Sequence, residues 1–155
     1  HGSGGAAKQS GGELYRRKSC LPGSAESGVV QFQRHRNPVF TTSVTEELLL
    51  HSDASSGRLE HARTLLKTLG LYAYKDTHPA ALSGGQKQRL SIACGLLSGR
   101  EILLFDEPTS GLDGGNMRKI AAVLTVAAAE GKTIGVITHD KELMQACCDF
   151  RWKLG

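Results

Sequence analysis

The chain has 155 residues, of which 39% are hydrophobic and 22% are charged, and these values are ordinary for one globular domain. No stretch approaches the roughly 20 consecutive apolar residues that cross a bilayer, and we recognise no signal peptide. The net charge of +4 lies in residues 1–40. We interpret it as a solvated surface and expect no nucleic-acid partner.

The cysteine spacing excludes the common thiol motifs. Cys20, Cys94, Cys147 and Cys148 form no Cys-x-x-Cys pair, so zinc and redox motifs are unsupported. Cys94 and Cys147 fall on apolar helix faces and are predicted to lie in the core. Thiols outside disulfides are typical of a reducing cytoplasm, where we expect this protein.

The first 40 residues predict little regular structure. Residues 1–28 are rich in Gly, Ser and Ala and predict loop, with one short strand over residues 11–15. A second strand is predicted over residues 28–32. Residues 33–40 form a polar segment that contains Gln33 and predicts a loop.

Two helices are predicted next. Ser43, with Glu46 three residues later, is a capping-box pattern that starts a short helix. A longer helix is predicted over residues 57–69. It ends before Gly70, and its apolar face is formed by Ala62, Leu65, Leu66 and Leu69.

A third helix is predicted after Ser83, which is a favoured N-cap residue. Gly84 and Gly85 allow the backbone to approach a ligand closely. A helix N-terminus with bare amides binds anions, so this start is a candidate anion site. The alternative is an ordinary capped helix after a glycine turn, which Ser-Gly-Gly alone favours. The apolar face of the helix is formed by Leu90, Ala93, Cys94 and Leu97.

The run Ile102–Phe105 is apolar throughout and predicts a strand buried on both faces of a parallel sheet. It ends in Asp106 and Glu107. Ligands bind beyond the carboxyl ends of such strands. One carboxylate there suits Mg²⁺ held through water, and the other suits polarising an attacking water. The alternative is a solvated turn, favoured by roughly two to one for Asp-Glu-Pro alone because short motifs match by chance.

The remaining pattern predicts a helix over residues 114–130, a strand over 133–138, a helix over 140–148 and a strand over 150–154. The buried stripe of the first helix is predicted to be Met117, Ile120, Ala121 and Leu124. His139 directly follows the strand 133–138. We therefore expect it at the same sheet edge as Asp106 and Glu107.

Five segments in this order resemble the motifs of ABC-type ATPases. The resemblance covers about residues 29–155. The Q-loop is matched by Phe32-Gln33 with Phe40, the signature motif by Leu82 to Arg89, the Walker B strand by Leu103 to Glu107, the D-loop by Ser110 to Asp113, and the switch histidine by His139.

The resemblance implies a nucleotide held between two such domains paired head to tail. The signature residues Ser83, Gly84, Gly85 and Gln86 of one domain would cap the γ-phosphate of ATP bound in the other domain's P-loop. Asp113 would contact the partner's site.

The resemblance also assigns the catalytic groups. Asp106 would hold Mg²⁺ through water, and Glu107 would be the general base. His139 would steady the γ-phosphate, and Gln33 would contact the metal ion and the attacking water.

The fold implied by the resemblance is α/β, a P-loop NTPase-like parallel sheet with flanking helices plus a helical subdomain. We expect a partial ABC ATPase domain over residues 1–155, with the N-terminal part of the fold missing. Its parts would be a loop-rich remnant over 1–28, a helical subdomain with the signature motif over 41–98, and a core with the Walker B, D-loop and switch-histidine segments over 99–155.

Residues 40–48, 130–133 and 137–140 resemble in particular the energy-coupling factor type of importer ATPase. That subgroup implies an ATPase subunit at the cytoplasmic face of the cell membrane, bound to transmembrane transporter subunits. Vitamins or metal ions would suit it as transported substrates.

A P-loop of the form Gly-x-x-x-x-Gly-Lys-[Ser/Thr] is absent from the sequence. In Gly131-Lys132-Thr133 the first glycine position is Val126, and a predicted strand follows instead of a helix. The simplest interpretation is that the chain begins just after the Walker A helix of a longer domain. We therefore expect weak or no MgATP binding by the chain alone, exposed unpaired strand edges and marginal folding.

Two alternatives stay open. One is a soluble ABC-type ATPase of DNA repair or chromosome maintenance, a class that favours long heptad insertions, which this sequence lacks. The other is a degenerate, non-catalytic ABC half, against which the presence of both Glu107 and His139 argues.

Overall fold

The computed structural model describes residues 13–17, 29–32, 41–50 and 56–153. Gln33 and Phe40 of the predicted Q-loop, and Cys20, lie outside the described residues. The elements in chain order are β1 (Glu13–Arg17), β2 (Val29–Phe32), α1 (Val44–Leu49), α2 (Ser56–Thr68), η1 (Tyr72–Tyr74), η2 (Pro79–Ala81), α3 (Gly84–Leu97), β3 (Ile102–Asp106), α4 (Gly114–Ala129), β4 (Thr133–Thr138), α5 (Lys141–Cys147) and β5 (Phe150–Lys153).

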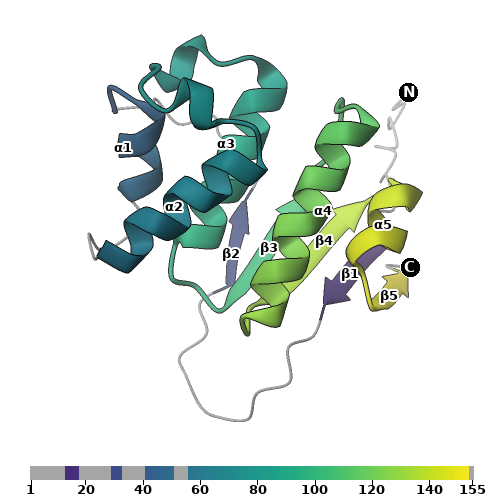
Figure 1. Cartoon of the computed structure of the whole chain (residues 1–155). Coiled ribbons are helices and arrows are strands. Elements are labelled where there is room, and N and C mark those ends of the chain that lie inside the picture. Colours follow the sequence, from purple (N-terminus) through teal and green to yellow (C-terminus); the bar gives the residue numbers. More distant parts are fainter. Residues whose placement is uncertain (1–12, 18–28, 33–40, 51–55, 154–155) are drawn as a thin grey trace, which may run out of the picture.

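The strands form one five-stranded sheet in the order β2-β3-β4-β1-β5 (Figure 1). The pairs β2/β3 and β3/β4 are parallel, and β1 runs antiparallel between β4 and β5. Parallel strands joined through helices are typical of an α/β fold, so the predicted fold class is confirmed. The predicted helix and strand boundaries agree with the described ones to within one or two residues.

The expectation of exposed unpaired edges stays a prediction, and the two edges of the described sheet are β2 and β5. β3, β4 and β1 each have a strand on both sides. β1 pairs along the whole of β4, from Glu13 opposite Thr138 to Arg17 opposite Ile134. The antiparallel strand therefore satisfies the backbone groups of β4 on its second side.

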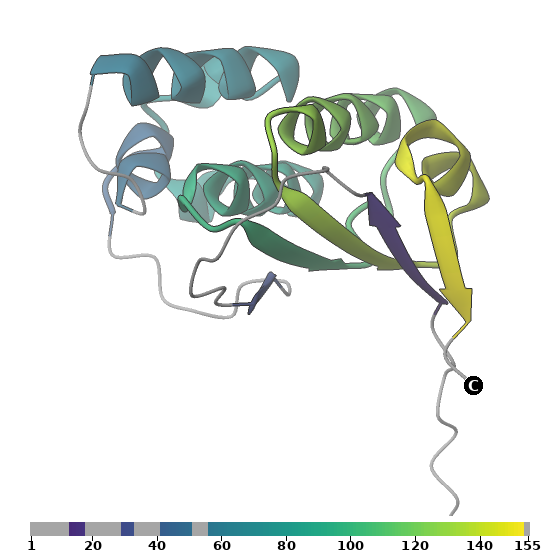
Figure 2. The ribbon, with the colours of Figure 1, turned by 90° about the horizontal axis from the view of Figure 1, so that it is seen from below.

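The described helices all cover one face of the sheet (Figure 2). On that face Leu103, Phe105, Ile134 and Val136 are buried, whereas Ile102 and Leu104 on the other face are only half-buried. The prediction that this run is buried on both faces is therefore wrong for the described structure. An apolar run without alternation does not reveal that the helices pack on one side.

Helix α4 lies over β3 and β4, while α1 and α2 stand beyond α3 on the β2 side (Figures 1 and 2). The predicted apolar faces are confirmed. The buried residues of α4 include Met117, Ile120, Ala121 and Leu124, and those of α3 include Leu90, Ala93, Cys94 and Leu97. These faces and the buried side of the sheet form one hydrophobic core.

The start of α1 is capped as the sequence predicts, with one further contact. Ser43 caps the helix as predicted, because its side chain accepts from the backbone N–H of Glu46. The Glu46 carboxylate also accepts from the N–H and the hydroxyl of Thr42, one residue before the cap, and these bonds are the main causes that lower the pKa of Glu46.

Among the helices in the described ranges, none combines the length and the apolar character needed to cross a membrane.

Candidate functional site

Strands β3 and β4 end together, and the residues that follow them form what we call the carboxyl edge, namely Asp106, Glu107, Thr138, His139 and Asp140. In the parallel register Asp106 lies beside Ile137. The N–H of Glu107 then donates to the carbonyl of Ile137 across 2.8 Å. This last bond carries the chain into a left-handed turn, because Glu107 has φ of 46°.

The Glu107 carboxylate is held in place from β4. Its Oε2 accepts a hydrogen bond of 3.1 Å from the Thr138 hydroxyl, and its Oε1 lies 3.8 Å from Nε2 of His139. Both side chains keep solvent access, with 36% of Glu107 and 65% of His139 exposed. The structure therefore brings Glu107 and His139 together at one edge, as the sequence predicts.

A hydrogen-bonded chain behind Glu107 was not predicted. Thr138 is completely buried, and its hydroxyl also accepts from the N–H of Asp140 at 3.0 Å. The Asp140 carboxylate caps α5 and accepts from the hydroxyl of buried Thr109 at 2.7 Å. A buried hydroxyl needs partners, so a threonine ending an apolar strand is the signal that identifies this position.

Asp106 is half-buried at the last position of β3. Among the described residues, none donates a hydrogen bond to its carboxylate, in contrast to Glu107. An uncommitted carboxylate oxygen at a strand end fits the ligand chemistry of Mg²⁺. The described residues contain no group of three or more His, Cys, Asp or Glu side chains that would hold a metal ion alone. Magnesium here would thus depend on water and phosphate oxygens for its other ligands.

The start of α3 is a complete capping box. Ser83 Oγ accepts from the N–H of Gln86 at 3.3 Å, and the Gln86 side chain accepts from the N–H of Ser83 at 2.8 Å. Ser83 and Gly84 are exposed. A side chain added at Gly84 would meet nothing within 4 Å. The start of α3 is therefore open to solvent at Ser83 and Gly84, and the helix dipole favours an anion there.

Gly85 has a different role from Gly84. A Cβ on Gly85 would lie 2.8 Å from Cδ2 of Leu112, so the helix start and the loop after β3 approach each other too closely for a side chain. Gln88, one turn further on, donates from Nε2 to the carbonyl of Glu107 at 2.8 Å. A hydrogen bond thus joins α3 directly to the turn at Glu107.

Arg89 is a further residue that sequence reasoning passed over. Its side chain is only 8% exposed, and its Nε has no hydrogen-bond partner among the described residues. Burying a guanidinium without full pairing costs free energy. The buried arginine therefore marks the start of α3 as a place that is not optimised for stability alone.

Asp113 lies at the other end of the loop after β3, where it caps α4. Its carboxylate accepts from the N–H of Asn116 at 2.9 Å and from the Asn116 side chain at 2.8 Å. The backbone N–H of Asn116 is the main cause that lowers the pKa of Asp113. The carboxylate is therefore ionised at neutral pH and fully exposed.

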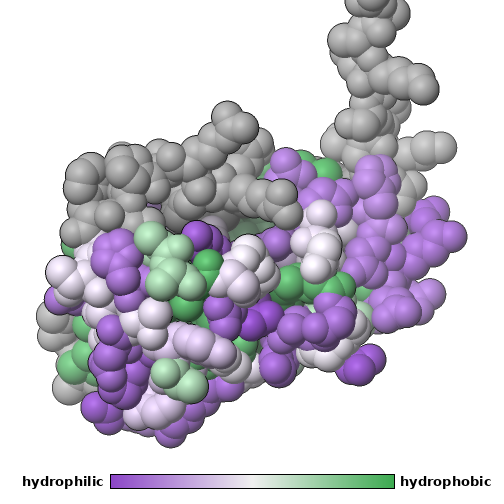
Figure 3. All heavy atoms as spheres, turned by 90° about the horizontal axis from the view of Figure 1, so that it is seen from above, coloured by the Kyte–Doolittle hydropathy of each residue, from purple (hydrophilic) through white to green (hydrophobic). Residues whose placement is uncertain are grey.

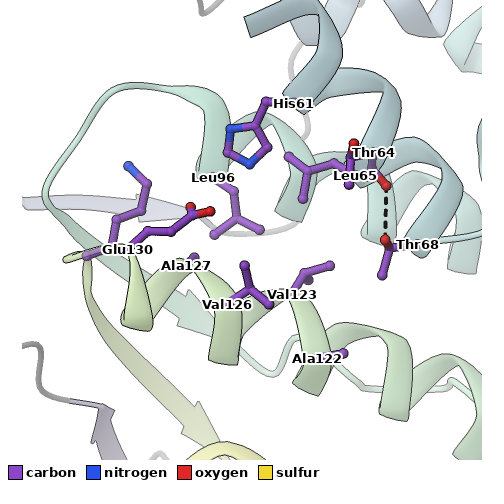
Figure 4. Close-up of a pocket in the computed structure, with 11 residues that line it drawn as sticks. His61, Thr64, Leu65, Thr68, Leu96, Ala122, Val123, Val126, Ala127 and Glu130 are labelled. Carbon is purple, nitrogen blue, oxygen red and sulfur yellow. Dashed lines mark hydrogen bonds between the residues drawn. The ribbon is translucent and has the colours of Figure 1, made fainter. Parts of the chain in front are cut away.

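The residues that follow β3 and β4 meet at the face shown in Figure 3, where hydrophilic residues cover most of the described surface and smaller hydrophobic patches lie between them. A cavity of about 140 Å³ lies elsewhere, between α2 and α4 (Figure 4). Leu65, Leu96, Val123 and Ala127 contribute apolar walls to it. Since Glu130 and Lys132 also line it and precede β4, it is at the opposite end of the strand from His139.

Comparison with known proteins identifies a matching protein family. The profile of the family described as ABC transporter matches residues 5–110. A putative ABC transporter ATP-binding protein of Treponema denticola is 38% identical over 111 residues, which is 72% of this chain and 23% of that protein.

Two further relatives differ in the direction of transport that their names state. A putative HMP/thiamine import ATP-binding protein of Bacillus subtilis is 37% identical, covering 76% of this chain and 22% of the relative. A macrolide export ATP-binding/permease protein of Mannheimia succiniciproducens is 46% identical, covering 58% of this chain and 14% of the relative. The chain thus spans less than a quarter of the length of these relatives.

Solved structures share the fold. A model of ribosome-bound archaeal Pelota and ABCE1 is similar with a TM-score of 0.69 and 31% identity, over 80% of this chain and 21% of the other. A dimeric ATP-binding cassette, described as a post-hydrolysis state bound to ADP and Pi, is similar with a TM-score of 0.63 and 24% identity, over 83% of this chain and 64% of the other.

Proposed function

The chain belongs to the ABC transporter family, and from that premise we propose that it is part of the ATP-binding subunit of a transporter, in which ATP hydrolysis drives transport. The observation that carries the proposal is the carboxyl edge. There the Glu107 carboxylate is fixed by Thr138 and lies 3.8 Å from Nε2 of His139. A fixed carboxylate beside an imidazole is suited to accepting a proton from an attacking water near a phosphate.

We assign the roles as follows. Glu107 is the general base, and His139 donates to the γ-phosphate. Asp106 would hold Mg²⁺ through water, and the chemistry supplied there would be neutralisation of charge on the phosphates. Gln33 lies outside the described residues, and its contact to the metal ion and water is proposed from its sequence position alone.

The second half of the site is the start of α3. We propose that Ser83, Gly84, Gly85 and Gln86 cap the γ-phosphate of ATP held by a second ABC domain, with Asp113 also facing that domain. The exposure of Ser83 and Gly84 supports this. The likeness to the dimeric cassette supports the fold that such pairing needs.

Among transporters, we propose an importer of the energy-coupling factor type. It would act at the cytoplasmic face of the membrane with transmembrane subunits, and residues 41–98 would serve as the helical subdomain. The import-type relative supports this, whereas the macrolide export relative supports the opposite direction. Uptake of a thiamine-like substrate into vesicles, measured with the full-length protein and its membrane subunits, tests the direction.

The test of the chemistry is Glu107→Gln in the full-length protein assembled with its partner subunits. The variant keeps the shape but loses the proton acceptor, so ATP turnover should fall by a factor of about 100 or more. Glu101→Gln is the matched control, because Glu101 is an exposed residue just before β3, at the other end of the strand. Turnover unchanged in Glu107→Gln would favour the degenerate, non-catalytic alternative.

The test of capping in trans uses calorimetry with MgATP. The chain alone should show little heat of binding, because it lacks a P-loop. When it is mixed with a P-loop-bearing partner domain, it should tighten that domain's affinity for MgATP. Micromolar binding by the chain alone would contradict the proposal. Stimulation of the full-length ATPase by DNA would instead favour the soluble alternative.

A further inference from the structure

Two adjacent thiols at the end of α5 face each other. Cys147 is the last residue of the helix and Cys148 follows it as the C-cap, and their Sγ atoms are 3.9 Å apart. Consecutive side chains diverge around a helix and alternate across a strand. Here the backbone leaves the helix between the two residues, with φ of −111° and ψ of 130° at Cys148, and both sulfurs come to the same side.

The two thiols differ in access. Cys147 is 4% exposed, and its Sγ donates to the carbonyl of Leu143 at 3.2 Å. Cys148 is half-buried. Both line a small gap whose other walls are Leu124, Ile134 and Val136. A reagent can therefore meet Cys148 from solvent before it reaches Cys147, and the buried side of the site is apolar.

The donor set decides which class of ligand fits. Two thiolates on one tetrahedral zinc ion would be about 3.8 Å apart, given Zn–S bonds of about 2.3 Å, so the observed spacing suits two sulfurs on one thiophilic centre. A structural zinc site needs four protein ligands. The described residues hold no group of three or more His, Cys, Asp or Glu side chains placed to bind a metal. The described residues therefore suit a ligand that takes two sulfurs from the protein and no third.

We propose that Cys147 and Cys148 form a vicinal dithiol site for trivalent arsenicals that carry one organic substituent. Such an arsenical, R–As(OH)₂ in water, condenses with both thiols. Two S–H bonds and two As–O bonds break, two As–S bonds form, and two water molecules leave. No electron is transferred, so no oxidant or reductant takes part. The substituent supplies the third bond of the arsenic and projects past Cys148 into solvent.

Binding has a structural consequence for α5. A bridge between neighbouring residues closes a very small ring, so it contributes little through the entropy of the unfolded chain. It also draws Cys147 away from the Leu143 carbonyl and from the apolar gap. The melting temperature of the adduct should therefore be lower than that of the thiol form.

The experiment uses the reduced 155-residue chain and phenylarsine oxide, followed by intact mass spectrometry and by counting of the remaining reactive thiols. The wild-type chain should take up one arsenical and lose two titratable thiols. A dithiol such as 2,3-dimercaptopropanol should release it, and a monothiol at equal thiol concentration should not. Cys148→Ser should abolish the dithiol-reversible adduct. Cys148→Ala, which adds no hydroxyl, gives a second test if the serine variant folds poorly by circular dichroism.

Two single-cysteine variants are the matched controls. Cys94→Ala removes a buried thiol whose pKa is raised to about 12 by burial. Cys20→Ser removes a thiol remote in sequence. Both should keep the adduct. Retention of a two-thiol adduct in either Cys148 variant, its loss in Cys20→Ser, or no adduct in the wild-type chain would overturn the proposal.

Discussion

The carboxyl edge and the start of α3 carry the two halves of the proposed site, but they are held together in different ways. At the edge, the Thr138–Glu107 and Thr109–Asp140 bonds each join residues 31 positions apart. At the start of α3, the Ser83–Gln86 bonds join residues three positions apart. The edge therefore exists only when the sheet has formed, whereas the helix start is encoded by a few consecutive residues. A substitution at the carboxyl edge should therefore destabilise the whole fold, whereas a substitution at the start of α3 should affect mainly that helix.

The largest effect is expected for Thr138→Val, which keeps the shape and removes the hydroxyl. The Asp140 N–H loses its acceptor and the Glu107 carboxylate loses a donor. We expect unfolding to become easier by about 1–3 kcal/mol. ATP turnover of the full-length protein should fall as well. Urea denaturation and an ATPase assay measure the two effects.

Thr133→Val is the matched control, because Thr133 begins the same strand and is half-buried. It should change the stability by about 0.5 kcal/mol or less. If Thr138→Val and Thr133→Val lowered the free energy of unfolding equally, the hydrogen bonds at the carboxyl edge would contribute no more stability than the other end of β4. That result would contradict the proposed difference.

A smaller cost is expected for Ser83→Ala. Loss of the N-cap should destabilise the chain by about 1 kcal/mol. Ser43→Ala removes the equivalent cap of α1 and should cost a similar amount. Only Ser83→Ala should weaken MgATP-dependent pairing of the full-length domains, measured by sedimentation. If both variants impair pairing alike, Ser83 acts through helix stability and not through the nucleotide.

The variants Gly84→Ala and Gly85→Ala should differ in thermal stability. Gly84→Ala should stabilise α3 by up to about 1 kcal/mol, since alanine favours helix and the added methyl meets nothing. In Gly85→Ala the methyl meets Leu112, and overpacking typically costs about 1–3 kcal/mol. Because Cδ2 is the end of a flexible side chain, we expect a cost at the low end. Thermal melts that rank Gly85→Ala above Gly84→Ala would contradict the close approach.

The smallest expected effect is on the stability of the fold at acidic pH. The pKa of Asp113 is lowered in the folded chain, mainly by the Asn116 N–H. A lowered folded pKa gives stability that is present above the unfolded pKa and is lost as the pH falls through the folded pKa. Asp113→Asn should therefore flatten the loss of stability below about pH 4 and change little at pH 7. If the variant lost stability more steeply than the wild type as the pH falls, the pKa of Asp113 would not be lowered by folding.

The sequence predicted what is periodic or local. Helical spacing identified the buried stripe of α4, and the N-caps Ser43 and Ser83 came from residue type and position. It also predicted that Glu107 and His139 share an edge, because parallel strands end together. The partners of Thr138, Gln88 and Thr109 were missed, since hydrogen bonds between distant segments leave no periodic trace in a single sequence.

The backbone of Glu107 has one more implication. A non-glycine residue at φ of 46° carries strain of about 1–3 kcal/mol, which glycine relieves and asparagine tolerates better. A mutant library screened for heat resistance alone should drift toward these two amino acids at position 107. Selection for thermal stability alone would then yield more stable proteins that lack the proton acceptor. Position 107 should therefore be kept as glutamate in any such library.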